Sequence, residues 1–121
     1  MKIWMPCSPH QAAQFVANGS LELASGFAIT PQWAQAINDD DEEFLEDVML
    51  DQAGHQERVV IVAQLAADIV DPEIGAVTVS EPLSLKKVHA FFAKSDATDD
   101  EFSWFGPTEG ANLLDFLGIS A

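Results

Sequence analysis

At the centre of the chain stands the sequence Arg58-Val59-Val60-Ile61-Val62-Ala63-Gln64-Leu65. Four consecutive residues of this stretch are β-branched, and β-branched side chains favour extended backbone. The run is apolar without the alternation of a half-exposed strand, which is typical of a central strand covered on both faces. We therefore expect a sheet at the centre of the domain, with helices packed over it.

Shorter strand signals lie on both sides of this central run. They are predicted at residues 2–6, 26–29, 76–79 and 88–92. Helical spacing competes with strand alternation over residues 83–93, and we expect a short turn at residues 84–87 before the last strand. Together with residues 58–65, these segments predict a single sheet of about five strands.

Helix signals separate the strands. Ser8 and Gln11 form a capping box with proline at the first helical position, and Thr30-Pro31 repeats the cap-plus-proline start. A third helix should begin after Asp39 or Asp40 and end near residue 54. The last helix should begin at residue 108 and end at residue 118, and residues 98 and 101 fit a further capping box.

The order of these elements predicts an α+β or mixed α/β fold. With 121 residues and no internal repeat, the chain is expected to form one domain, residues 1–121. A helix connects the first two strands, which favours placing them in parallel, side by side or across one intervening strand, with a right-handed crossover.

The charge of the chain is strongly one-signed. The formal net charge is −15, and eight of the 20 acidic residues lie within residues 39–51. Lys and Arg are absent between Lys2 and Arg58. Direct binding of nucleic acid and of anionic membranes is not expected, because both need clustered Lys and Arg. Hydrophobic residues still make up 48% of the chain, which is enough for an ordinary core.

The acidic segment carries the leading functional hypothesis. On a helix, Glu43, Asp47 and Asp51 fall at i, i+4 and i+8 and form one ridge of carboxylates. Such a ridge favours an interaction or regulatory module that docks a basic protein surface, with mimicry of nucleic acid as a special case. The other readings are a solvated face that aids solubility, weak binding of divalent cations, and adaptation of the host to salt. The segment lacks the glycine of an EF-hand loop, and we predict neither a metal site nor a cofactor.

The alternative site is the turn that holds Cys7 and His10. A thiol at a helix N-terminus has a lowered pKa, and a nearby histidine can act as its base, so this turn could belong to a small enzyme or to a ligand-binding pocket. The competing reading is a small, partly buried structural cysteine. A single cysteine, no signal-peptide pattern and no apolar run of about 20 residues predict a cytoplasmic protein.

The remaining residues with functional potential have simpler structural interpretations. His55 is expected at the C-terminal end of the acidic helix, where a protonated imidazole interacts well with the helix dipole. His89 is expected in a strand, in the core or at an edge. The aromatic residues within 102–107 fit a core plug, although aromatic side chains also form binding hot spots.

Several short motifs together resemble a group of small acidic actinobacterial proteins that form a domain of unknown function. The motifs are Lys2-Ile3-Trp4-Met5-Pro6, Ala28-Ile29-Thr30-Pro31, the acidic helix before Arg58-Val59-Val60-Ile61-Val62, Pro82-Leu83 before Val88-His89, and Trp104-Phe105. The resemblance covers nearly the whole chain. It implies one cytosolic domain and supplies no activity or catalytic residue.

Overall fold

A computed structural model describes residues 1–55, 57–96 and 98–119 of the chain. The helices are α1 (Pro9–Asn18), α2 (Pro31–Ile37), α3 (Glu42–Ala53), the 3-10 turn η1 (Leu85–Lys87) and α4 (Gly110–Leu117). The strands are β1 (Lys2–Cys7), β2 (Ser20–Leu21), β3 (Ser25–Phe27), β4 (Val59–Gln64), β5 (Asp68–Asp71), β6 (Ala76–Thr78), β7 (Leu83–Ser84), β8 (Val88–Ala93) and β9 (Ser103–Phe105). This is an α+β fold, as predicted. None of the described helices is long and apolar enough to cross a membrane.

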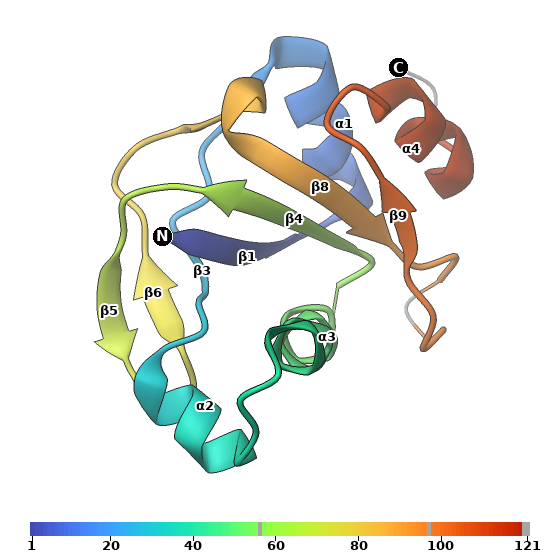
Figure 1. Cartoon of the computed structure of the whole chain (residues 1–121). Coiled ribbons are helices and arrows are strands. Elements are labelled where there is room, and N and C mark those ends of the chain that lie inside the picture. The colour runs from blue at the N-terminus through green and yellow to red at the C-terminus, as the bar shows by residue number, and fades with distance from the viewer. Residues whose placement is uncertain (56, 97, 120–121) are drawn as a thin grey trace.

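The main sheet has seven strands in the order β5-β6-β3-β1-β4-β8-β9, and every pairing in it is antiparallel (Figure 1). β2 and β7 form a separate two-stranded sheet. The sequence predicted about five strands and missed both edge strands of the main sheet. β5 carries an aspartate at each end, and β9 is only three residues long, so neither shows a strong strand pattern.

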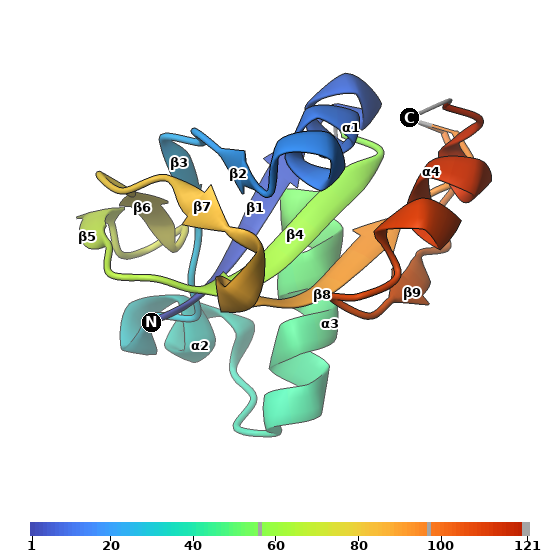
Figure 2. The same cartoon turned by 90° about the horizontal axis from the view of Figure 1, so that it is seen from above.

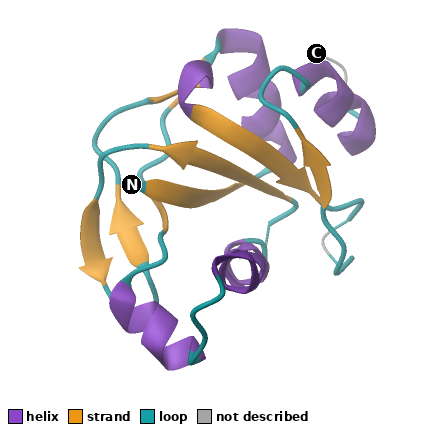
Figure 3. Ribbon diagram, viewed as in Figure 1, coloured by secondary structure: helices purple, strands orange, loops and turns teal. Residues whose placement is uncertain are grey.

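β4 is the buried strand that its apolar sequence predicted. Its first five residues are all buried, and its neighbours are β1 and β8. Val59, Ile61 and Ala63 face the core under α1 and α4, whereas Val60 and Val62 face the core under α2 and α3. Helices therefore cover both faces of the sheet, as Figures 1 and 3 show.

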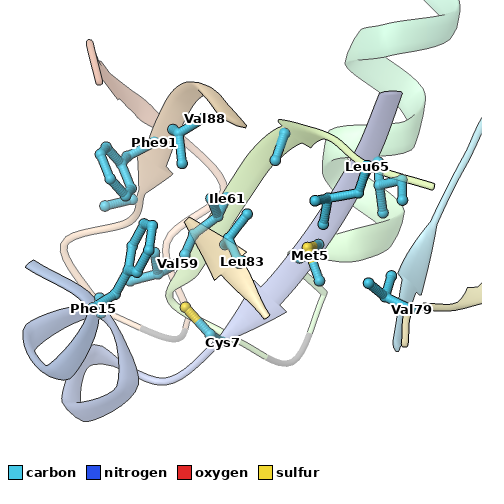
Figure 4. Close-up of a cluster of buried hydrophobic side chains, with 14 of the residues drawn as sticks. Met5, Cys7, Phe15, Val59, Ile61, Leu65, Val79, Leu83, Val88 and Phe91 are labelled. Atoms are coloured by element: carbon cyan, nitrogen blue, oxygen red, sulfur yellow. The ribbon is translucent and has the colours of Figure 1, made fainter. Parts of the chain in front are cut away.

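The larger core lies between the sheet and helices α1 and α4. Figure 4 shows its side chains beside α1 and the central strands. Phe15 of α1 and Phe91 of β8 are both fully buried, and their ring centroids lie 6.0 Å apart in a tilted arrangement. Met5 and Ile61 pack from the two central strands, and Leu83 of the small sheet closes the cluster. Burial of each such side chain contributes about 1.5–3 kcal/mol.

The second core lies on the opposite face, under α2 and α3. Trp4, Trp33 and Met49 are its large buried members. The Trp33 indole Nε1–H donates a hydrogen bond to Oε1 of Gln52 at 2.9 Å, and Nε2 of Gln52 donates to the carbonyl of Ile74 at 2.8 Å. These two bonds tie α2 and α3 to the turn between β5 and β6.

The expected parallel arrangement of the first two strands is wrong. β1 and β3 are direct neighbours and run antiparallel, with Trp4 opposite Phe27. After α1 the chain first pairs as β2 with β7 and only then joins the main sheet. The helix is therefore not the direct return of a βαβ unit, and the rule of right-handed crossovers does not apply.

Two of the first three predicted helix N-caps are present in the structure. The Ser8 capping box and the Thr30 cap are present as predicted. The third helix is capped by Asp41 rather than by Asp39 or Asp40, because Asp39 accepts a hydrogen bond from the Asp41 backbone N–H and so forms the turn before the cap.

Two expectations near the C-terminal end of the chain are wrong. No helix follows Thr98, because its backbone N–H and its hydroxyl both donate to the side chain of Asp96 and hold a turn. The last helix begins at Gly110 after Glu109, two residues later than expected. Glu109 instead accepts the Gly106 backbone N–H at 2.8 Å, which closes the preceding turn. The predicted short turn before β8 is confirmed as η1.

Gly75 and Gly19 offer a test of how the fold depends on the turn between β5 and β6. Both have positive φ, +74° and +72°. A Cβ at Gly75 would collide with the carbonyl oxygen of Ala28, whereas a Cβ at Gly19 would meet nothing. We expect Gly75→Ala to lower the free energy of unfolding by about 2–4 kcal/mol, and Gly19→Ala by about 1–2 kcal/mol, as measured by urea denaturation. Equal losses would show that the Gly75 contact is not tight.

Candidate functional site

Helix α3 packs on the sheet through one side only. Leu45, Met49 and Ala53, spaced four residues apart, are buried in the second core. Figures 1 and 2 show α3 lying across one face of the sheet, between α2 on one side and β9 on the other. The opposite side of the helix is therefore free to carry side chains that contribute nothing to the core.

The predicted ridge of carboxylates lies on that free side. Glu43, Asp47 and Asp51 are all exposed. Among the described residues none of the three has an ion-pair partner, and the ion pair found there joins Nζ of Lys2 to Oε1 of Glu46 at 2.7 Å. Since a helix rises 1.5 Å per residue, successive carboxylates of the ridge are spaced by about 6 Å along the helix axis.

The helix itself does not explain the whole ridge. Glu43 lies in the first turn, where the positive end of the helix dipole favours a carboxylate. Asp47 and Asp51 lie beyond that turn, and each like-charged i, i+4 pair costs roughly 0.2–0.5 kcal/mol. The last turn contains no basic residue. The ridge is thus slightly unfavourable for the isolated helix.

A second acidic segment meets the end of α3 in space. Asp51 lines a hollow of about 340 Å³ together with Asp99 and Asp100 from the loop after β8. Lys94 also lines the hollow but is only 4% exposed, and its Nζ donates to the carbonyl of Gly54 at 2.6 Å. It also lies 5.4 Å from the ring centroid of Phe102. This lysine anchors the end of α3 and forms no ion pair with the described acids.

Hydrogen bonds keep two acids of this loop ionised. The Thr98 hydroxyl donates to Asp96, and the Ser95 hydroxyl donates to Asp99 at 2.6 Å. Each bond favours the carboxylate and lowers the pKa of its aspartate below the ordinary value. The loop therefore extends the negative surface of α3 toward the end of β8.

A groove of about 310 Å³ lies beside the ridge, between α3 and strands β8 and β9. Its lining comprises Lys2, Trp4, Glu46, Asp47, Leu50, Val62, His89, Ala90, Phe92 and Trp104. Trp104 is 60% exposed, so the prediction that this aromatic segment plugs the core is wrong for Trp104. Its register opposite Phe92 on the edge strand places it beside α3 instead of inside the domain.

His89 lies at an irregularity of β8. Ala63 pairs with Val88 and Val62 pairs with Ala90, which leaves His89 as an extra residue in its strand. Bulges of this kind redirect a side chain and occur often beside functional sites. His89 is exposed and faces the groove, while His55 is exposed just after the end of α3, where the sequence predicted it.

A third hollow lies between α3 and α2. It measures about 380 Å³, and its lining is mostly apolar, with Trp4, Ile29, Leu45 and Ile69 among its residues. Acidic residues of the loop before α3 and of α3 itself stand at its rim. Helix α3 is thus flanked by a depression on each side.

The alternative site at Cys7 and His10 has a different character. Cys7 ends β1 and is 1% exposed, whereas His10 in the first turn of α1 is exposed. Burial, with a smaller contribution from the charge of Glu57, raises the pKa of the Cys7 thiol to about 12. At neutral pH this group is a protonated thiol packed in the larger core, as in the structural reading of the cysteine.

Within residues 1–55, 57–96 and 98–119, no three His, Cys, Asp or Glu side chains converge in a geometry that could hold a metal ion. The acids of α3 are spread along the helix, as side chains four residues apart must be.

One part of the site follows from the sequence, and the other part does not. The spacing of Glu43, Asp47 and Asp51 predicted one exposed face, and the structure places all three there. Sequence reasoning missed Trp104 and His89 as neighbours of this face. The acidic composition of residues 96–101 was visible in the sequence, but nothing there indicated that this loop lies beside the end of α3.

The chain is similar in sequence to a family of known proteins. Residues 1–100 match a family described as "Family of unknown function (DUF6912)". Neither the curated proteins nor the solved structures give a match. The matched residues include the whole of α3 and His89, and they end before β9.

The buried thiol leads to a direct test by alkylation. At pH 8 we expect iodoacetamide to modify Cys7 in the folded protein roughly 1000-fold more slowly than in urea-unfolded protein, because three pKa units separate about 12 from the ordinary value of 9.0. Mass spectrometry of timed samples gives both rates. A folded-state rate within tenfold of the unfolded rate would restore Cys7 and His10 as a reactive site.

The same group makes a prediction about pH. The thiol of the unfolded chain ionises from about pH 9, but the folded protein resists ionisation up to about pH 12. The unfolded state therefore loses its proton first, and the stability of the fold should fall as the pH rises from 9 to 12. Urea denaturation of the parent protein and of Cys7→Ala at pH 8 and pH 10.5 measures this fall. An equal change of unfolding free energy in both proteins would contradict it.

Proposed function

The chain belongs to the family of unknown function DUF6912, which assigns no activity, and we propose that it is a small acidic interaction or regulatory module. Its ridge of Glu43, Asp47 and Asp51 docks a basic surface of a partner protein. A cytoplasmic location and a place among small acidic actinobacterial proteins belong to the same proposal.

The observation that carries this proposal is the uncompensated ridge itself. The three carboxylates are exposed on one side of α3 and lack an ion-pair partner among the described residues. Two of them, Asp47 and Asp51, gain nothing from the N-terminal end of the helix dipole. A basic partner would neutralise these charges. Binding would then remove the repulsion between the carboxylates, and this relief would add to the binding free energy.

The distribution of basic residues supports the same reading. Of the five Lys and Arg residues, Lys2 pairs with an acid of α3, and Lys94 donates to the backbone carbonyl of Gly54 at the end of α3. Arg58 donates to the backbone carbonyls of Lys94 and Ser95, which follow β8. Lys86 and Lys87 belong to η1, whose segment lies on the α1 side of the sheet (Figure 1). Such a one-signed face speeds the encounter with a basic partner and makes binding sensitive to salt.

Mimicry of nucleic acid is a special case of this proposal. Helix α3 carries five carboxylates over 12 residues, and Lys2 neutralises one of them, Glu46. The other four correspond to one charge per roughly 4.5 Å of helix axis. One strand of duplex DNA carries a phosphate per about 3.4 Å. A partner that binds DNA through a basic groove would therefore meet a similar density of charge on α3.

The enzyme or ligand-binding alternative at Cys7 and His10 would need a thiolate that substrate can reach. The burial of Cys7 and its raised pKa argue against that chemistry. The remaining alternative, that the acidity adapts the protein to salt, makes a different prediction. If the acidity only adapts the protein to salt, acidic residues on every face should contribute equally to solubility, and none should form a specific docking face.

A matched pair of triple variants tests the ridge. Glu43→Gln/Asp47→Asn/Asp51→Asn removes three charges from α3. The control replaces Glu22, Glu81 and Asp115, which are exposed outside α3, by Gln, Gln and Asn. Proteins captured from host lysate at low salt by the wild-type chain should bind the ridge variant at least about tenfold more weakly, since each lost ion pair contributes up to about 1 kcal/mol.

The control variant should keep the same captured proteins, and high salt should release them from both the wild-type chain and the control. If the ridge variant captures the same proteins with the same affinity, the ridge serves only solubility. If both triple variants lose binding equally, the overall charge of the chain acts without a defined docking face.

A further inference from the structure

We propose that the groove between α3 and strands β8 and β9 binds one arginine side chain of the basic partner. The guanidinium stacks on the indole of Trp104 and pairs with the carboxylate of Asp47. This inference rests on the proposed docking function and adds to it the side chain that the partner must present.

The groove adjoins the proposed docking face directly. Asp47 belongs to the ridge and also lines the groove, so a side chain that leaves the ridge toward β8 reaches the groove without crossing another element. Leu50, Val62 and Phe92 contribute apolar walls. In Figures 1 and 2 this side of α3 faces β8 and β9, with no helix covering it.

Trp104 is the residue of the groove with the features of a binding hot spot. It is 60% exposed, whereas Trp4 and Trp33 are each 3% exposed. An indole held on an edge strand beside an apolar wall offers a large rigid contact surface, and Trp and Arg are the residues most often found at binding hot spots. The hydrophobic core does not require this exposed ring.

The chain itself shows how this groove holds a cation. Nζ of Lys2 lies 2.7 Å from a carboxylate oxygen of Glu46 and 5.5 Å from the ring centroid of Trp4. A carboxylate and an indole thus already hold one ammonium group at the groove. Asp47 and Trp104 repeat the same two chemical groups in the same groove, and among the described residues no cation pairs with either of them.

The charge balance of the groove selects a single cation. The charged side chains of its lining are Lys2, Glu46 and Asp47, and their formal charges sum to one negative charge. Arginine fits better than lysine, because a planar, weakly hydrated guanidinium can stack on an aromatic face and pair with a carboxylate at the same time.

Two blocked peptides of equal length and charge provide the test, one with three arginines and one with three lysines, each separated by glycines. Titration of the ¹⁵N-labelled protein should shift the indole Nε1–H signal of Trp104 and leave that of Trp33, which does not line the groove, in place. The arginine peptide should bind several-fold more tightly than the lysine peptide. Trp104→Leu should weaken the arginine peptide roughly fivefold, and Trp104→Phe, which keeps an aromatic face, should weaken it less.

Asp47→Asn should also weaken the arginine peptide more than the lysine peptide. Glu43→Gln/Asp51→Asn changes the ridge outside the groove and should weaken both peptides equally. Equal affinity for the two peptides, an unmoved Trp104 signal, or an unchanged affinity in Trp104→Leu would overturn the arginine site. In those cases a loss of binding in Glu43→Gln/Asp51→Asn would still uphold the ridge, so the two proposals fail separately.

Discussion

The pairing of β1 with β4, buried on both faces, is the interaction on which the rest of the structure depends. Six residue pairs join the two strands, and every residue of β4 except Gln64 is buried. Side chains alternate between the two cores, so that each helix layer packs against the same pair of strands. Loss of this pair would leave α3 without the Trp4, Val60 and Val62 surface that carries it.

Because α3 packs on the sheet through one side, the residues that stabilise the fold differ from those that carry its negative charge. The buried contacts of α3 with the sheet come from Leu45, Met49 and Ala53, whereas its outward positions carry exposed side chains. A chain with net charge −15 can therefore keep a continuous apolar core while concentrating carboxylates on one side. The charges still repel one another, and in the proposed docking function a basic partner relieves that repulsion. Under that proposal, the stability of the fold and the affinity for the partner can be changed by different substitutions.

Local patterns predicted the elements better than their arrangement. Capping by Ser8 and Thr30, the end of α3 near Gly54 and the buried run of β4 follow from neighbouring residues, and these predictions are confirmed. The antiparallel order of β1 and β3 was missed, because it depends on the pairing of β2 with β7, about 60 residues further along. The exposure of Trp104 was missed because an aromatic residue looks the same in a core as at a surface until its strand is placed.

The sequence by itself determined the α+β class, the central buried strand and a helix with Glu43, Asp47 and Asp51 on one face. These features depend on residues within a few turns of one another, where geometry is set by the backbone periods of helix and strand. Only the tertiary structure decided what lies beside that face. The groove with Trp104 and His89, the approach of Asp99 and Asp100 to the end of α3, and the burial of Cys7 arise from contacts between distant segments, which no local period encodes.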